Sequence, residues 1–252
     1  LVSKNGQIKR LSLQDFSVVR YSKPITCMKL LGDDELADVA FTDGDMNVML
    51  FSSDGLAISY NENELALAGM KSGGVKGFAK LGKAEVVNVL AYPKDNCEGK
   101  VALITDKACV RIYDPRKTEV STRLGRPSVV FNTFKNDEHS LVLAFKLDTS
   151  IEKTMVRFLT NMKEVKEIVI DDYHLTPMDY YAHTTVEIGK KNLLDIPFLE
   201  GKEVVKADTI SHAREIPVET PKEDNEITSE SEEKMKEEEE KGYTQISIFD
   251  ED

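Results

Sequence analysis

The chain has 252 residues, of which 40% are hydrophobic and 31% are charged, with 45 Asp and Glu against 33 Lys and Arg. No apolar run approaches the ~18 residues of a membrane-spanning helix, so we expect no membrane partner. The three cysteines, Cys27, Cys97 and Cys109, are odd in number and form no CxxC pair. This argues against a disulfide framework and favours a reducing, cytoplasmic compartment.

The acidity is concentrated at the C-terminal end of the chain. Residues 208–252 hold 16 Asp and Glu against 5 Lys and Arg, and subtracting them from the totals leaves 29 acidic and 28 basic residues in 1–207. Within that body, residues 1–135 hold 19 basic and 16 acidic residues. The low overall pI therefore does not argue against a polyanionic partner. Because residues 219–241 have almost no apolar content, we predict that the acidic tail, 208–252, is disordered.

A fourfold repeat is the main signal for the fold. Each copy has an apolar strand, a short polar turn, a return strand and a loop rich in Gly, Pro and Ser. The turns begin at Ser3, Ser52, Thr105 and Thr160, at spacings of 49, 53 and 55 residues. A period near 50 residues is typical of propeller-like arrays. We predict an all-β domain over 1–207, with repeats at 1–46, 47–99, 100–152 and 153–207.

The expected strands follow in chain order. The first repeat opens on the hairpin around residues 3–6 and continues to a strand at 36–40. The second repeat is the clearest, with predicted strands at 47–51, 56–60, 78–81 and 85–90. The third has predicted strands at 101–104, 109–113, 129–131 and 141–145. The fourth is degenerate, as terminal repeats often are, with strands at 155–159, 165–170 and 204–205. Ala108 replaces the turn glycine of the first two repeats, so we expect a looser hairpin there.

Signals for catalysis are weak. Residues 77–83 have the spacing of a phosphate-binding loop, but Ala84 stands where a hydroxyl would hold Mg²⁺, and the pattern is that of an apolar strand. The four histidines form no pair with metal-ligand spacing. Cys109 lies inside a strand pattern and is expected to be a core residue. We predict that this chain alone is not catalytic and holds no metal or cofactor.

Positive charge recurs at matched places in the first three repeats. The candidate DNA-binding residues are Lys4, Lys9, Arg10, Arg20, Lys23 and Lys29 in the first, Lys71 and Lys76 (with Lys80 nearby) in the second, and Arg111, Arg116, Lys117, Arg123 and Arg126 in the third. In a ring, these residues would form a stripe along the rim that suits a phosphate backbone. Any one of them alone is more often a solvated surface charge, so the prediction concerns the set.

Three further features refine the expected partner. Gly73, Gly74 and Gly77 would let phosphates approach the main chain closely. No aromatic stripe interleaves the charges, which favours duplex over single-stranded DNA. The loop of the fourth repeat, 171–174, is acidic, so DNA contact by that repeat is not expected.

The same residues carry a family resemblance. Residues 1–10 resemble the T-x-x-G-x-x-K-R repeat of the C-terminal domain of type IIA topoisomerase A subunits. Residues 20–24, 68–77 and 122–127 resemble successive blade loops of that domain. The order of these motifs is most similar to the topoisomerase IV branch. A gyrase-type box, Gln-Arg-Arg-Gly-Gly-Lys-Gly, is not found, which also favours topoisomerase IV over gyrase.

The resemblance implies a β-pinwheel, which is a ring of four-stranded blades with strands exchanged between neighbours. It implies a module that binds and guides double-stranded DNA during relaxation and decatenation in the cytoplasm, at the nucleoid. The catalytic Tyr and Mg²⁺ ligands would lie in the N-terminal core of the same polypeptide, and the ATPase in a partner B subunit of a heterotetramer. Because Leu1 opens within a strand motif with no initiator Met, we expect the chain to be a piece of a longer protein.

Other functions stay open. The repeat fits a gyrase-type DNA-wrapping domain or a protein-interaction propeller equally well, and the near-match to a phosphate-binding loop leaves a nucleotide-binding fragment as a third possibility. The acidic tail either competes with DNA for the basic loops or serves as a solubilising end. Residues 243–249 alternate apolar and polar side chains, which fits either an added strand or a frayed end.

Overall fold

The computed structural model describes residues 1–17, 24–79, 81–132, 138–148, 153–170, 183–184 and 192–198. The chain divides into two units, Leu1–Lys202 and Glu203–Asp252, and every described residue belongs to the first. The regular structure of the described residues consists of strands and the short 3-10 helices η1 (Leu13–Phe16), η2 (Glu62–Glu64) and η3 (Pro115–Lys117). In this part of the chain no helix is long and apolar enough to cross a membrane. The predicted all-β class is confirmed, while the acidic tail and the loop 171–174 lie outside the described residues.

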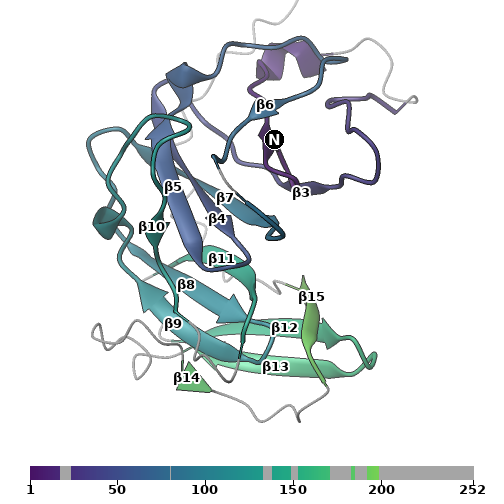
Figure 1. Ribbon diagram of the computed structural model, residues 1–252, viewed down its shortest axis with the longest axis vertical. Helices are drawn as coiled ribbons and strands as arrows, with labels where there is room; N and C mark the ends of the chain where they lie inside the picture. The colour runs from purple at the N-terminus through teal and green to yellow at the C-terminus, as the bar shows by residue number, and fades with distance from the viewer. Residues whose placement is uncertain are drawn as a thin grey trace, which may run out of the picture. The chain divides into compact units, whose positions relative to one another are not determined.

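The described strands form four antiparallel sheets that follow one another along the chain (Figure 1). The order in the first sheet is β3 (Leu36–Asp38), β1 (Val2–Ser3), β2 (Gln7–Ile8), β6 (Val75–Lys76). The second has β10 (Ser128–Val129), β5 (Leu56–Asn61), β4 (Met46–Ser52), β7 (Val86–Pro93). The third has β11 (Leu141–Leu147), β8 (Lys100–Thr105), β9 (Cys109–Tyr113), β14 (His183–Thr184). The fourth has β13 (Val165–Ile170), β12 (Thr154–Thr160), β15 (Leu194–Phe198).

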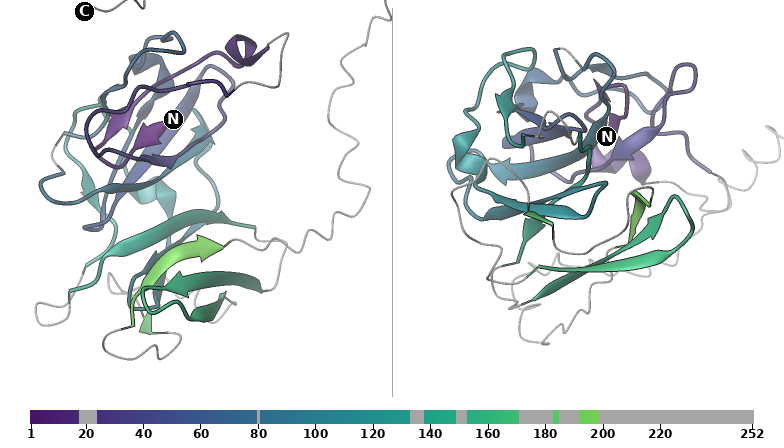
Figure 2. Two further views of the ribbon diagram at one scale, coloured as in Figure 1. Left: turned by 90° about the vertical axis from the view of Figure 1, so that its right-hand side faces the viewer. Right: turned by 60° about the horizontal axis from the view of Figure 1, so that its bottom comes forward.

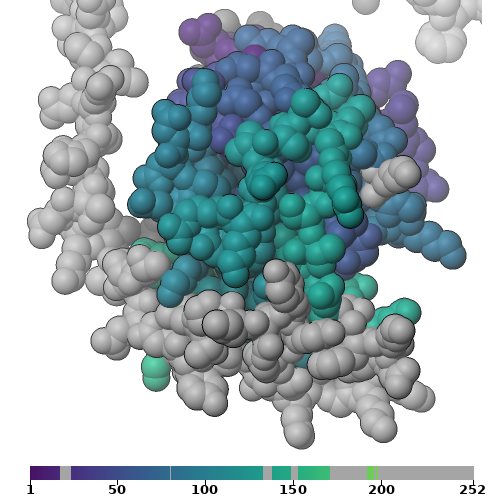
Figure 3. Space-filling model, turned by 60° about the vertical axis from the view of Figure 1, so that its left-hand side comes forward, coloured from purple at the N-terminus to yellow at the C-terminus, as the bar shows by residue number. Residues whose placement is uncertain are grey.

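Three of the sheets take one strand from the following repeat. β6 pairs with β2, β10 with β5, and β14 with β9, each antiparallel. The two further views in Figure 2 show the successive sheets as separate blades. In the space-filling view, third-repeat residues in teal lie directly against second-repeat residues in blue (Figure 3). The strand exchange implied by the resemblance is confirmed.

The exchanged strand of the second repeat is not the predicted one. Residues 78–81 do not form a strand among the described residues; Phe78 is instead buried in the core, with 1% exposed. The strand is Val75–Lys76, between Gly74 and Gly77. A Cβ on Gly77 would lie 2.6 Å from Ile8 Cγ2, and one on Gly74 would lie 2.8 Å from Met28 Cε. Glycines therefore flank β6 because it packs too closely on the first sheet to admit side chains there.

In the fourth sheet, Leu194–Phe198 is the strand paired with β12. The predicted strand at 204–205 lies outside the described residues.

Each hairpin begins at a buried hydroxyl residue with 0% exposed: Ser3, Ser52, Thr105 and Thr160. Its carbonyl accepts a hydrogen bond of 2.9–3.0 Å from the residue three positions later, where φ is left-handed at 57–80°: Gly6, Gly55, Ala108 and Lys163. The side-chain hydroxyl of the same Ser or Thr accepts a second hydrogen bond, of 3.1–3.3 Å, from the main-chain amide four positions later. These amides belong to Gln7, Leu56, Cys109 and Glu164. The Ala108 turn keeps the geometry of the glycine turns, so the expectation of a looser hairpin there is wrong.

The residue after each buried hydroxyl links neighbouring sheets through main-chain hydrogen bonds. The Ser53 amide donates to the Glu85 carbonyl just before β7, and the Val86 amide donates to the Lys4 carbonyl in the preceding sheet, both at 2.8 Å. The same arrangement recurs twice, with hydrogen bonds of 2.7–2.9 Å. The Asp106 amide donates to the Ser140 carbonyl, and the Leu141 amide donates to the Ser53 carbonyl. Likewise, the Asn161 amide donates to the Leu193 carbonyl, and the Leu194 amide donates to the Asp106 carbonyl. We call this series, through Lys4, Ser53, Asp106 and Asn161, the inter-sheet belt.

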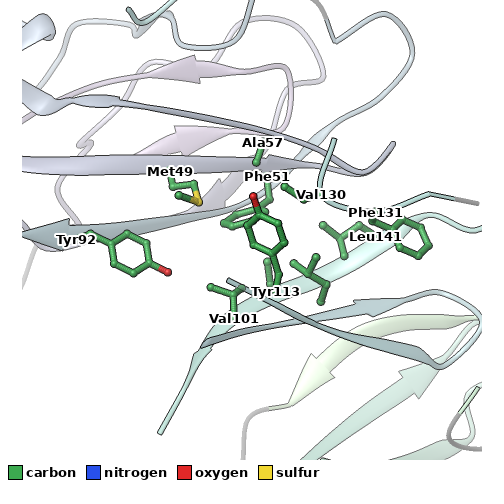
Figure 4. Packing of buried hydrophobic residues seen from close by; sticks show 11 residues of the cluster. Met49, Phe51, Ala57, Tyr92, Val101, Tyr113, Val130, Phe131 and Leu141 are labelled. Carbon is green, nitrogen blue, oxygen red and sulfur yellow. The ribbon is translucent and has the colours of Figure 1, made fainter. Parts of the chain in front are cut away.

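Three hydrophobic clusters fill the spaces between successive sheets. Figure 4 shows the middle one, in which side chains of the second sheet face those of the third; among its members are Met49, Phe51, Tyr92, Val101 and Tyr113. The cluster before it contains Ile8 and Leu50, and the cluster after it contains Ile104 and Phe158. Each sheet between two clusters is therefore buried on both faces, which explains the uninterrupted apolar runs of β4 and β8.

A glycine pair tests how the hairpin turn controls stability. Gly55→Ala should lower the free energy of unfolding by about 2–4 kcal/mol, because the left-handed φ costs ~1–2 kcal/mol for an L-residue and the new Cβ would lie 2.5 Å from the Phe131 carbonyl oxygen. Gly32→Ala is the control: its φ is +60° and no described neighbour lies within 4 Å of a Cβ built there, so about 1 kcal/mol is expected. Urea denaturation measures both; equal losses would contradict this account of the turn.

Candidate nucleic-acid interface

The structure sorts the predicted basic residues by exposure and bonding. Those with exposed side chains and no acidic partner at ion-pair distance among the described residues are Lys29, Lys71, Lys76, Lys117 and Arg126. Those with identified local bonds are Lys4, Arg10, Arg116 and Arg123. Lys9 and Arg111 are buried, with 3% and 6% exposed. Arg20, Lys23 and Lys80 lie outside the described residues.

Three of the predicted residues form ion pairs. Lys4 Nζ lies 2.6 Å from Glu35 Oε2, and this hydrogen bond raises the pKa of Lys4. Arg10 Nη1 donates to Asn63 Oδ1 at 2.9 Å and lies 3.5 Å from Glu62 Oε2. The Arg116 guanidinium binds Asp114 with two nitrogens, Nη2 at 2.8 Å from Oδ2 and Nε at 3.0 Å from Oδ1. These three charges are partly neutralised by their own chain.

Lys9 and Arg111 do not belong to the exposed set, contrary to the sequence-based prediction. Lys9 Nζ donates to three main-chain carbonyls, and burial lowers its pKa. Arg111 Nη1 donates to the Val130 carbonyl, and the guanidinium lies 5.6 Å from the centre of the Tyr113 ring. Both residues stand six positions after a buried hydroxyl residue, where the return strand turns its side chain inward. Burial at this position places both cations away from the surface.

The loops that carry the exposed cations form a continuous surface, which we call the basic rim and define as segments 24–31, 62–76 and 114–127. The first two segments are joined by the Lys29 amide, which donates to the Ser72 carbonyl at 3.1 Å. The second and third are joined by the Arg123 side chain, which donates to the Lys76 carbonyl. Figure 3 shows the contact between second-repeat and third-repeat residues. Basic loops from three repeats thus lie side by side, as the repeat predicted.

Most carboxylates of the basic rim are held in local bonds. Glu64 Oε2 accepts from the Arg123 amide at 2.6 Å. Asp114 binds Arg116, and this hydrogen bond lowers the pKa of Asp114. Glu62 is buried, with 2% exposed, and accepts from Thr42 Oγ1 at 2.6 Å and from the amides of residues 44 and 46. Glu119 is exposed. The carboxylates that stay exposed without a cationic partner among the described residues are therefore Glu64 and Glu119, which the five exposed Lys and Arg side chains outnumber.

The glycines around β6 serve packing more than phosphate approach. Gly74 and Gly77 are closed off by Met28 and Ile8, as described for β6. Gly73 is exposed, and the nearest atom to a Cβ built there is the Lys29 carbonyl oxygen at 3.5 Å. Of the three glycines predicted to admit a phosphate, only Gly73 has the space.

Neither a phosphate-binding loop nor a metal cluster occurs among the described residues. Residues 81–84 form a turn closed by the Ala84 amide on the Leu81 carbonyl at 2.8 Å, and no helix follows it in the described part. That part of the chain contains no group of three His, Cys, Asp or Glu side chains placed to hold a metal. Cys109 is buried in β9, as predicted.

An apolar cavity of about 360 Å³ opens on the first sheet and borders the basic rim, because Cys27, Glu62 and Leu65 are among its lining residues, with Lys9. Its walls include Leu1, Leu13, Phe16 and Phe41, with the Arg10–Glu62 pair on its polar side. Apolar walls of this kind suit an apolar side chain or peptide segment, whereas a phosphate requires convergent donors.

Comparison with known proteins agrees with this geometry. The DNA gyrase C-terminal domain family, a β-propeller, matches residues 1–43 and 47–93. The A subunit of DNA topoisomerase 4 from Bacillus subtilis (strain 168) is 28% identical over 144 residues, which is 57% of this chain and 17% of that protein. The A subunit of DNA gyrase from Buchnera aphidicola subsp. Baizongia pistaciae (strain Bp) is 34% identical over 137 residues, which is 54% of this chain and 16% of that protein.

The fold also matches a solved structure. The crystal structure of the C-terminal domain of DNA topoisomerase IV superposes with a TM-score of 0.67 at 22% identity, covering 78% of this chain and 59% of that one. The chain spans 16–17% of the length of the two curated relatives. Sequence, strand exchange and fold agree: the chain is similar to the C-terminal β-propeller domains found in the A subunits of DNA gyrase and topoisomerase IV.

Proposed function

We propose that this chain is the DNA-binding domain of a type II topoisomerase A subunit of the topoisomerase IV kind, and that it holds a duplex segment for the catalytic core. The observation that carries the proposal is the continuity of the basic rim. Loops from three repeats are joined by the Lys29–Ser72 and Arg123–Lys76 hydrogen bonds. Their exposed cations therefore form one surface and are not isolated charges.

Such a surface suits the backbone of duplex DNA. Phosphates recur along both strands, and neutralising them releases condensed counterions whatever the base sequence. The rim offers flexible Lys side chains as point charges, together with Arg126, which can form two hydrogen bonds to one phosphate. This chemistry positions DNA and does not read its bases, as a domain that guides any chromosomal segment requires.

Catalysis is assigned to other parts of the enzyme. Tyr60, Tyr92 and Tyr113 are buried, with at most 2% exposed, and burial raises the pKa of each. A buried phenol with a raised pKa is a poor nucleophile, so none of these three tyrosines suits DNA cleavage. By resemblance, the DNA-cleaving Tyr would lie in an N-terminal core of the same polypeptide. By resemblance, Mg²⁺ would act at that core, ATP at a partner B subunit, and the assembled heterotetramer in the cytoplasm at the nucleoid.

A second function has one observation in its favour. The apolar cavity on the first sheet is bordered by Leu13 and Phe41, with 63% and 75% exposed. Exposed apolar groups around a cavity are typical of a protein-docking surface. Capture of a partner protein that survives nuclease treatment would favour this function over DNA binding.

The salt dependence of binding tests the main proposal. If the five exposed cations of the basic rim each neutralise one phosphate, log K should fall with log salt with a slope of about −4.5. Fluorescence anisotropy with a labelled duplex of mixed sequence, titrated at several salt concentrations, gives this slope directly. A flat dependence would rule out a phosphate-binding surface.

A charge-matched pair of variants tests where the DNA lies. Lys76→Ala with Arg126→Ala removes two exposed rim cations and should reduce the salt slope by about 1.8, weakening binding to all sequences alike. The control, Lys83→Ala with Lys153→Ala, removes two exposed cations that lie outside the basic rim and have no acidic partner at ion-pair distance among the described residues. Anisotropy should show unchanged affinity for the control. Equal losses in both variants would mean that net charge, and not the rim, governs binding.

A further inference from the structure

We propose that Lys9 is a positioning residue for DNA binding: it contacts no DNA, and its buried ammonium fixes the two loops that present Lys29 and Lys71. The inference rests on the proposed function of the basic rim. It assigns Lys9 a role different from that of the exposed cations, with which the sequence groups it.

The ammonium of Lys9 is fully used inside the protein. Its Nζ donates to the carbonyls of Cys27 at 2.8 Å, Met70 at 2.8 Å and Ser72 at 2.9 Å. An ammonium has three donors, so these bonds leave none for a phosphate. Only 3% of the residue is exposed, so little of the side chain is accessible to a DNA backbone at the surface.

The three carbonyls come from two different segments of the basic rim. Cys27 precedes Lys29 by two residues, and Met70 and Ser72 flank Lys71 on either side. The Ser72 carbonyl also accepts from the Lys29 amide at 3.1 Å. One buried cation thus holds the main chain directly beside both exposed lysines.

Further bonds extend this junction into the second loop. The Ser72 amide and hydroxyl both donate to the Gly69 carbonyl, at 3.1 and 2.8 Å. The loop around Lys71 contains no strand between residues 62 and 74. Its first part is held by the Ala68 amide, which donates to the Arg10 carbonyl at 2.9 Å, and residues 69–72 are held by the Ser72 bonds and by Lys9. Loops ordered on folding need not be ordered again on binding, which favours affinity.

Comparison of the repeats shows that the fold itself does not require a cation here. The residue six positions after the buried hydroxyl is Lys9 in the first repeat and Ile58 in the second, where 1% is exposed. An apolar side chain therefore fits this position when no loop carbonyls converge on it. Burying a cation is unfavourable unless hydrogen bonds compensate, and at Lys9 the compensating groups are those of the two DNA-facing loops.

The test is a double-mutant cycle on duplex affinity. Lys9→Met should lower affinity about fivefold, since loosening both loops weakens the contacts of Lys29 and Lys71 together. In a Lys29→Ala, Lys71→Ala background, Lys9→Met should have no further effect. If its loss of affinity is instead the same in both backgrounds, Lys9 acts on DNA independently of these lysines and the proposal is overturned.

Amide hydrogen exchange supplies a local readout. In Lys9→Met, exchange of the Lys29 amide, which is bonded to Ser72, should accelerate, while that of the Val86 amide in the inter-sheet belt should stay slow. Acceleration of both would indicate general destabilisation and contradict a local positioning role. If the wild-type chain does not bind duplex DNA, the proposed function is ruled out. If the wild-type chain binds and Lys9→Met has the same duplex affinity, only the positioning role is ruled out.

A milder variant covers the case in which Lys9→Met does not fold. Ser72→Ala deletes only the hydroxyl bond to the Gly69 carbonyl and leaves Lys9 in place. It should lower duplex affinity about twofold in the wild-type background and not at all in the Lys29→Ala, Lys71→Ala background. Unchanged affinity in the wild-type background would show that order in this loop does not matter to DNA binding.

Discussion

The buried hydroxyl at the start of each hairpin is the constraint on which the rest of the structure depends. Ser3, Ser52, Thr105 and Thr160 fix a left-handed residue three positions later, so the same tight turn forms with Gly, Ala or Lys there. The residue directly after each buried hydroxyl residue then has its main-chain amide and carbonyl free to form hydrogen bonds with two different sheets. Four turns of one geometry thus become an inter-sheet belt, in which main-chain bonds set the spacing of successive blades independently of side-chain identity.

The basic rim follows from this arrangement. Each return strand leads away from its turn, so the loops after β2, β5 and β9 begin at the end of the sheets opposite the belt. Strand exchange then carries the loops after β5 and β9 from their own sheets to the preceding ones, where β6 and β10 pair, while the loop after β2 leads to β3 of its own sheet. A loop that crosses between sheets must lie beside its neighbours. The contiguity of the rim is therefore a consequence of the topology, and its charge is a property of the residues placed on it.

The sequence predicts the period, the all-β class and the basic loops, because turn residues and strand patterns are local signals. It does not predict β6, because Val75–Lys76 is a short strand defined by a partner far away in the chain and by the space that Gly74 and Gly77 leave open. The burial of Lys9 is equally hidden, since its partners Met70 and Ser72 act through main-chain carbonyls that any residue carries. The repeated Ser or Thr at each turn is visible as a pattern, although its hydroxyl bonds are not.

One recurring position shows how a repeated backbone hosts different chemistry. Six residues after the buried hydroxyl stand Lys9, Ile58, Arg111 and Lys166, and only Lys166 is partly exposed, 2.9 Å from Glu164. The backbone determines that this side chain points inward in the first three sheets, while its chemistry depends on which carbonyls converge there. A count of Lys and Arg therefore overstates the DNA-facing charge of such a domain. In the proposed function, some cations would bind phosphate and others would hold the loops that carry them, and the two kinds differ in burial and not in sequence.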